Sequence, residues 1–161
     1  MNDEESRNNL LKWVLATFGG IDCLVNNAGF GPFQDLRYKH EGPIPEDLID
    51  ETFDINYKGL VRMIALFTQA FYEDSKIINI GSRAGKIDRI GTHIANRVIG
   101  YASGITPSIE HLQDIMDEFK QAAMKGKHLE LGFRNSVYHV SKILVMRFTE
   151  DILPKLLTPN Q

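Results

Sequence analysis

Tyr138 and Lys142 are the two residues whose types and spacing best suit catalysis in this chain of 161 residues. On a helix, residues four positions apart share one face, so the Lys142 ammonium can act on the Tyr138 phenol. A positive charge about 6 Å away favours the phenolate, even at an effective dielectric constant of about 20. A phenol tuned in this way can protonate a carbonyl oxygen as hydride reaches the carbonyl carbon. The pair therefore predicts a general acid for carbonyl chemistry.

The spacing of this pair is weak evidence by itself, because Tyr-x-x-x-Lys arises by chance in many chains. Tyr72 and Lys76 have the same spacing. Asp74 and Ser75 would interrupt a helix there, and Lys76 begins a run that favours a strand. Without further context, a structural role for Tyr138 is the simpler interpretation.

Three other motifs supply that context. In chain order they are Asn26-Asn27-Ala28-Gly29 after an apolar run, Ile55-Asn56-Tyr57-Lys58-Gly59 in a helical pattern, and Asn79-Ile80-Gly81-Ser82 after a second apolar run. Together with Tyr138 and Lys142, this order resembles the short-chain dehydrogenase/reductase superfamily over residues 4–153. The resemblance implies a catalytic tetrad of Asn56, Ser82, Tyr138 and Lys142.

The same resemblance implies a role for each of these residues. Tyr138 would be the general acid, and Ser82 would hydrogen-bond the substrate carbonyl. Lys142 would tune the tyrosine and hold the nicotinamide ribose, while Asn56 would position a water that links Lys142 to solvent. Taken alone, Ser82 is as well explained as a loop hydroxyl, and Asn56 as a polar residue inside a helix. The implied cofactor-binding residues are Asn27, Ala28, Gly29, Tyr138 and Lys142.

A long separation between Ser82 and Tyr138 points to one branch of the superfamily. Residues 86–134 contain an extra helical pattern, which is similar to the insertion of the NADPH-dependent carbonyl reductases. That branch implies NADPH as cofactor, an aldehyde, ketone or quinone as substrate, and a monomeric complete form. Tyr101, Ile105 and Phe133 lie in the insertion and are candidates for substrate contact, with core or loop packing as the alternative.

Hydrophobic periodicity predicts the elements that position these motifs. Helices are expected over about 3–18, 45–71 and 135–153, the last breaking near Pro154. Within the insertion, a further helix opens at Thr106-Pro107 and ends near Gly126. The apolar run at 21–25 predicts a parallel strand buried on both faces, and the run at 76–80 predicts a second strand. The pattern is that of an α/β fold, a Rossmann-like doubly wound parallel sheet.

Composition excludes several other classes of function. The formal net charge is −3, without the basic block that a nucleic-acid partner would require. No apolar run approaches the roughly 20 residues that span a bilayer, and the acidic start does not resemble a secretory signal. The lone Cys23 lies in an apolar run, which predicts a buried thiol in a reducing compartment, by default the cytoplasm. No histidine has metal-ligand spacing, so no metal is expected.

Only part of such a fold is contained in residues 1–161. The Gly-rich turn that binds the cofactor pyrophosphate is not present, nor are the residues that would select NADPH over NADH. We therefore expect one partial dinucleotide-binding domain that lacks the first βαβαβ half and the last strands, with strand edges through which it can self-associate. Three explanations stay open: a partial chain of a reductase, a natural short variant that is a catalytically inactive protein-interaction module, or assembly with a partner chain that supplies the missing half.

Overall fold

A sheet of two parallel strands organises the described part of the protein, which in the computed structural model is residues 3–33, 35, 42–99 and 106–157. Strand β1 (Ile21–Asn26) pairs with β2 (Phe71–Asn79). Asn26 lies opposite Asn79, so both strands end at the same edge of the sheet. The helices are α1 (Glu4–Phe18), α2 (Glu46–Phe53), α3 (Gly59–Phe67), α4 (Thr92–Ile99), α5 (Ile109–Met124), α6 (Val137–Arg147) and α7 (Leu153–Leu157).

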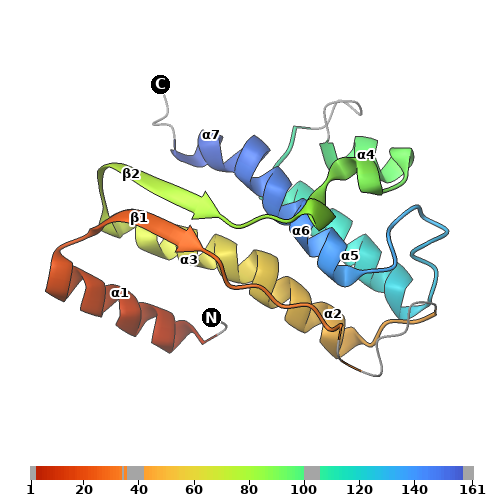
Figure 1. Ribbon diagram of the computed structural model, residues 1–161, viewed down its shortest axis with the longest axis horizontal. Coiled ribbons are helices and arrows are strands. Elements are labelled where there is room, and N and C mark those ends of the chain that lie inside the picture. Colours follow the sequence, from red (N-terminus) through yellow and green to blue (C-terminus); the bar gives the residue numbers. More distant parts are fainter. Residues whose placement is uncertain (1–2, 34, 36–41, 100–105, 158–161) are drawn as a thin grey trace.

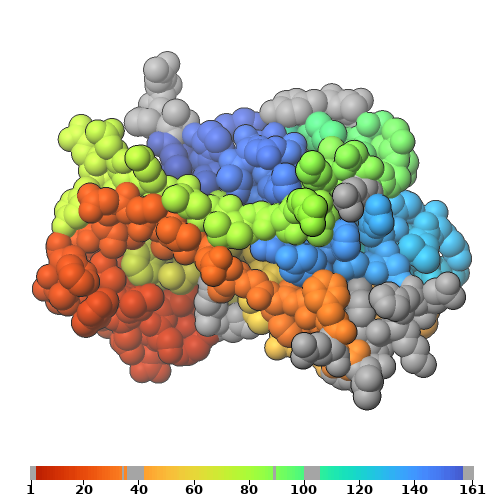
Figure 2. All heavy atoms as spheres, in the orientation of Figure 1, coloured from red at the N-terminus to blue at the C-terminus, as the bar shows by residue number. Residues whose placement is uncertain are grey.

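One face of the sheet is covered by helices and the other is bare. Helix α3 contacts both strands, and Figure 1 shows the strands passing in front of it. On the open face, Val25 and Ile78 keep 53% and 44% of their surfaces exposed. Figure 2 shows atoms of β1 and β2 at the surface on this side. We call this surface, formed by Cys23, Val25, Ile78 and Ile80, the bare face.

The bare face corrects one prediction and agrees with another. The first strand was expected to be buried on both faces, with Cys23 inside, but Cys23 is exposed. The reason is that no described residue covers that side of the sheet. The predicted fold class, an incomplete parallel α/β sheet, is confirmed.

The main core lies between the helices behind the sheet. Helix α2 packs against α6 and α5, and edge-on ring contacts join Phe53 to Phe119 and Phe119 to Phe133. A second, smaller cluster joins α1 to α3 through Leu11, Val14, Met63, Phe67 and Ala70. The insertion therefore contributes to the same core as the motif-bearing helices.

The two long helical segments each contain a π-helical turn. Asp54–Lys58 joins α2 to α3, and Phe148–Ile152 joins α6 to α7. The expected break near Pro154 is wrong, because the π-helical turn Phe148–Ile152 runs directly into α7, which contains Pro154 and continues to Leu157. The expected helix over 45–71 also ends earlier, since β2 already begins at Phe71.

Residues 86–134 contain one helix that was not predicted. Helix α4 has only two fully buried apolar residues, Ile94 and Val98, which is too short a pattern to stand out in the sequence. Helix α5 begins at Ile109 rather than at Pro107, because the Ser108 hydroxyl caps it by accepting a hydrogen bond from the His111 N–H at 3.1 Å. No helix of the described residues is both long and apolar enough to cross a membrane.

The beginning and end of this insertion meet. The Gly91 N–H donates to the Gly132 carbonyl at 2.9 Å. A Cβ at Gly91 would lie 3.2 Å from the Cα of Gly132. Glycine therefore allows a closer approach of the two backbones than a residue with a side chain would.

Candidate active site

Side chains at the ends of the two strands join the sheet to α6. The Asn26 amide donates to the Asn79 side-chain oxygen at 2.9 Å, and the Asn79 amide donates to the Thr149 hydroxyl at 2.9 Å. Thr149 in turn donates to the Val145 carbonyl on α6 at 2.7 Å. Asn26 keeps only 6% of its surface exposed. Buried amides with partners of this kind fix the relative position of strands and helix.

Asn56 fastens the loop after β1 to α6. It lies in the π-helical turn between α2 and α3 and is buried. Its Oδ1 accepts from the Phe30 N–H at 2.7 Å, while its Nδ2 donates to the Phe30 carbonyl and to the Ser141 hydroxyl, both at 2.8 Å. The Ser141 hydroxyl donates onward to the Tyr138 carbonyl at 2.9 Å. Both ends of the Asn56 amide are thus engaged.

Lys142 is a nearly buried cation at the centre of the site, with 4% of its surface exposed. Its Nζ donates to the Ile80 carbonyl at 2.8 Å and lies 5.9 Å from the centre of the Tyr138 ring. Burial holds the pKa of Lys142 below its usual value, because an ammonium loses hydration there. The separation from Tyr138 agrees with the distance expected for two residues four apart on a helix.

Gly29 leaves space beside the Lys142 ammonium. A Cβ at this position would lie 3.5 Å from Lys142 Nζ and 3.7 Å from Asn56 Oδ1. Asn27, Ala28 and Gly29 are all exposed. An open backbone at a strand end, with an ammonium directly behind it, fits the ribose and nicotinamide end of a dinucleotide.

Ser82 lies two residues beyond Ile80, the residue whose carbonyl holds Lys142. The Ser82 hydroxyl oxygen accepts from the Ala84 N–H at 3.1 Å and caps a 3₁₀ turn over Arg83–Gly85. This turn packs against α6. A Cβ at Gly85 would lie only 2.6 Å from the Lys142 carbonyl oxygen, so this close approach requires glycine.

Two residues at this site were not predicted. Ser141 could have been found from its place between Tyr138 and Lys142 on the buried face of one helix. Phe33 lies edge-on to the Tyr138 ring, with ring centres 5.2 Å apart, yet nothing in the sequence marks it. Of the predicted substrate contacts, Phe133 is buried against Phe119 in the core. Tyr101 and Ile105 lie outside the described residues.

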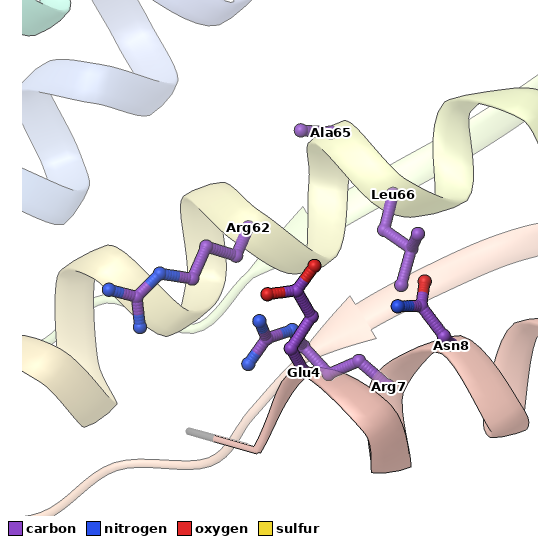
Figure 3. Close-up of a pocket in the computed structure, with 6 residues that line it drawn as sticks. All are labelled: Glu4, Arg7, Asn8, Arg62, Ala65 and Leu66. Atoms are coloured by element: carbon purple, nitrogen blue, oxygen red, sulfur yellow. The ribbon is translucent and has the colours of Figure 1, made fainter.

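Among the described residues, no metal cluster adds to the site, and the hollow between α1 and α3 lies apart from it. Within residues 3–33, 35, 42–99 and 106–157, no three His, Cys, Asp or Glu side chains gather to hold a metal ion. A shallow hollow between α1 and α3 is shown in Figure 3, where Glu4 and Arg7 lie beside each other. Arg62 on its rim pairs with Asp54 at 2.7 Å. None of the residues lining this hollow belongs to the predicted tetrad.

Comparison with known proteins decides the family. The family model described as short chain dehydrogenase matches residues 1–94, more than half of the chain. The chain belongs to the short-chain dehydrogenase family.

Curated relatives of this family member extend the match along almost the whole chain. Farnesol dehydrogenase of Aedes aegypti is 30% identical over 96% of this chain and 56% of its own length. Carbonyl reductase [NADPH] 1 of Mus musculus is 27% identical over 97% of this chain and 54% of its own length. (+)-Neomenthol dehydrogenase of Arabidopsis thaliana is 27% identical over 95% and 57%. The chain spans about half the length of these relatives.

Solved structures share the fold of this family member. Salutaridine reductase from Papaver somniferum superposes with a TM-score of 0.79 at 18% identity, covering 96% of this chain and 62% of that one. Menthone neomenthol reductase from Mentha piperita gives a TM-score of 0.70 at 22% identity, over 96% and 64%. These likenesses confirm the predicted Rossmann-like α/β class.

Proposed function

We propose that residues 1–161 carry the catalytic part of an NADPH-dependent reductase that converts an aldehyde, ketone or quinone to an alcohol. One observation carries the proposal. The Lys142 ammonium lies 5.9 Å from the centre of the Tyr138 ring, at the edge of the sheet where both parallel strands end. Similarity to a relative named carbonyl reductase [NADPH] supports the choice of cofactor and substrate class.

Tyr138 and Ser82 act on the carbonyl oxygen in this proposal. NADPH, when bound, would supply the hydride for the carbonyl carbon. Tyr138 gives its phenolic proton to the oxygen as negative charge develops there. The Ser82 oxygen accepts from the Ala84 N–H, which leaves the Ser82 hydrogen free to be donated to the same substrate oxygen. The two hydroxyls thus divide protonation and hydrogen bonding between them.

Lys142 supports Tyr138 and holds the cofactor. An ammonium has three N–H donors, of which the Ile80 carbonyl accepts one. The others can reach ribose hydroxyls through the space that Gly29 leaves open, and the charge stabilises the phenolate of Tyr138. Asn27 and Ala28 would line the same space beside Gly29.

Asn56 positions these groups through the loop after β1 and Ser141. Because both ends of its side-chain amide are engaged by Phe30 and Ser141, its direct effect is to hold α6 against the strand end. The water relay expected of Asn56 from the resemblance stays a prediction.

A second candidate function follows from the bare face. A surface with exposed Val25, Ile78 and Ile80 could bind another protein chain, and a non-catalytic interaction module would use it in that way. In the alternative of partner assembly, the same surface would contact a chain that supplies a cofactor-binding half. Monomeric behaviour of the complete form and a cytoplasmic location stay predictions of the sequence.

The deciding experiment follows NADPH oxidation by the full chain with a quinone, an aromatic aldehyde and a cyclic ketone. We expect Tyr138→Phe to lower kcat by about 100-fold or more, since general acid catalysis contributes on that order. Tyr72→Phe is the matched control, because Tyr72 has the same spacing to a lysine but lies in β2. It should leave kcat unchanged.

Two results would reject catalysis by this chain. One is wild-type turnover no faster than that of Tyr138→Phe while circular dichroism shows both chains folded. The other is an equal loss in Tyr72→Phe. Titration of the same samples with NADPH, followed by cofactor fluorescence, separates a chain that does not bind the cofactor from one that binds it without turnover.

A further inference from the structure

His128 is a fully buried polar residue outside the site just described. It lies in the turn after α5, where Gly126 adopts a φ of 69° and the Lys127 N–H returns to the Ala122 carbonyl at 2.8 Å. Its side chain has 0% of its surface exposed. A polar ring is costly to bury without hydrogen bonds, so its partners indicate what it does.

The partners of His128 lie on the segment that leads into α6. Its Nε2 is 2.8 Å from the Asn135 side-chain oxygen, and its carbonyl accepts from the Phe133 N–H at 3.0 Å. Its ring lies edge-on to Phe119 of α5, with centres 5.8 Å apart. One residue therefore binds both ends of the loop 128–135 and seats it on the inserted helix.

Asn135 is followed directly by the first turn of α6. The Ser136 hydroxyl caps this helix by accepting from the His139 N–H at 3.3 Å, and the Ser136 carbonyl accepts from the Val140 N–H at 3.3 Å. Tyr138 lies in this first turn, between Ser136, which accepts both hydrogen bonds, and His139 and Val140, which donate them. A shift of Asn135 would therefore move the turn that carries Tyr138, whereas Lys142 is held one turn further on by Ile80.

We propose that His128 is a positioning residue, through which the inserted helix α5 sets the place of the Tyr138 phenol relative to Lys142. The inference rests on the proposed function in so far as Tyr138 is the acid. It assigns the insertion a role in catalytic geometry in addition to its role in the core. A misplacement of about 1 Å in a catalytic group can cost about 100-fold in rate, so such a brace has a measurable consequence.

The test is ¹⁹F NMR of the full chain labelled with 3-fluorotyrosine, which reports on its five tyrosines whether or not the chain turns over. The Tyr138 resonance is assigned as the one that disappears in Tyr138→Phe. We expect His128→Leu to move the Tyr138 resonance by more than its linewidth. His128→Gln should restore it, because a glutamine amide places an N–H donor near the position of Nε2.

Two further variants keep the test decisive. Asn135→Ala removes the acceptor of the His128 hydrogen bond, so it should move the same resonance and serves if His128→Leu does not fold. Met63→Ala opens a cavity in the separate cluster between α1 and α3; it should lower the melting temperature and leave the Tyr138 resonance in place.

The inference is overturned by an unmoved Tyr138 resonance in His128→Leu or in Asn135→Ala, or by an equal movement in Met63→Ala. A merely structural role for His128 would also leave His128→Gln no better than His128→Leu. Where turnover is found, kcat should fall in His128→Leu and recover in His128→Gln, with KM for the carbonyl little changed. Absence of turnover in every chain counts against the proposed function alone, because the resonance still reports on the brace.

Discussion

At the scale of single residues, Lys142 carries a charge that the fold places almost out of contact with water. Burial lowers its pKa, so the folded chain binds fewer protons at this residue than the unfolded chain in the alkaline range below 10.5. Where the unfolded state binds more protons, stability rises with pH. The unfavourable contribution of Lys142 is thus greatest below its lowered pKa and is relieved as the pH rises toward 10.5.

Lys142→Met tests this sign. We expect the free energy of unfolding of wild type, relative to that of Lys142→Met, to increase as the pH is raised toward 10.5. Lys120→Met is an opposite-signed control. Hydrogen bonds to Asp50 and then Glu46 raise the pKa of Lys120, so its stabilising contribution is present below its ordinary pKa and is lost above it. Urea titrations at several pH values measure both; equal curves for the two variants would contradict the assignment.

Burial shifts the pKa of Tyr57 in the direction opposite to that of Lys142. Tyr57 is a phenol with no hydrogen-bond partner among the described residues. Its hydroxyl is buried, and burial, then the charge of Glu110, raises its pKa. We expect Tyr57→Phe to be neutral or to stabilise the chain by about 1 kcal/mol, because it removes an unsatisfied polar atom.

The pH dependence of Tyr57→Phe follows from the same raised pKa. Wild-type stability should fall as the pH rises above 10, the ordinary tyrosine value, since only the unfolded phenol then ionises freely. Tyr57→Phe should fall less steeply. A Tyr57→Phe chain that is less stable than wild type at neutral pH would show that the hydroxyl has a partner.

At the scale of elements, the 3₁₀ turn after β2 packs closely against α6 because Gly85 has no side chain. A Cβ at Gly85 would lie 2.6 Å from the Lys142 carbonyl oxygen, which is backbone and cannot move aside. We expect Gly85→Ala to destabilise the chain by about 1–3 kcal/mol, as overpacking does. Gly85→Ala should also impair the site, because it would push the turn that Ser82 caps away from α6, which carries Lys142.

Gly81→Ala is the matched control for this prediction. A Cβ at Gly81 would meet only the Met146 side chain, at 3.4 Å, and a flexible methionine can adjust. Thermal unfolding of both variants should show the larger loss for Gly85→Ala. Similar losses would mean that the turn and α6 are not closely apposed.

Element by element, the sequence predicts the motifs better than the boundaries around them. Asn56 and Lys142 were predicted as site residues and Asn26 as the start of a strand-end motif. The three share one hydrogen-bonded region, because parallel strands bring their ends to a common edge. The start of β2 was missed, since Tyr72 to Ser75 are polar residues typical of a loop. Pro154 was taken as a helix break because its position within the first turn of α7 depends on where the preceding π-helical turn ends.

At the scale of the whole molecule, the bare face is the feature that the sequence described least well. Cys23, Val25 and Ile78 have the apolar character of strands covered on both sides, and a sequence pattern cannot show which cover is present. We expect the isolated chain to self-associate through this face, because a two-stranded sheet with one open side is marginal in water.

Sedimentation velocity over a range of concentrations tests this expectation. Val25→Glu combined with Ile78→Lys should weaken association by about tenfold or more, since burying each of these side chains is worth roughly 1.5–3 kcal/mol. The two positions lie opposite each other, so their opposite charges leave the strand pairing intact.

Trp13→Glu tests whether a second apolar surface, rather than the bare face, mediates the association. Trp13 and Phe18 on α1 are exposed and in edge-on contact. If Trp13→Glu weakens association and the strand variant does not, the contact runs through α1 and the prediction fails.

The contact between Gly91 and Gly132 has a consequence for how the chain could be divided. Because the two backbones already meet there, a direct link between them would bypass α4 and α5 without altering the path of the remaining chain. Ile94, Leu112 and Phe119 nevertheless fill the main core, so the shortened chain would be left with an apolar void. The segment between the two glycines is therefore dispensable to the connectivity and indispensable to the packing, which are the properties of a peptide that can be cut out and restored by complementation in trans.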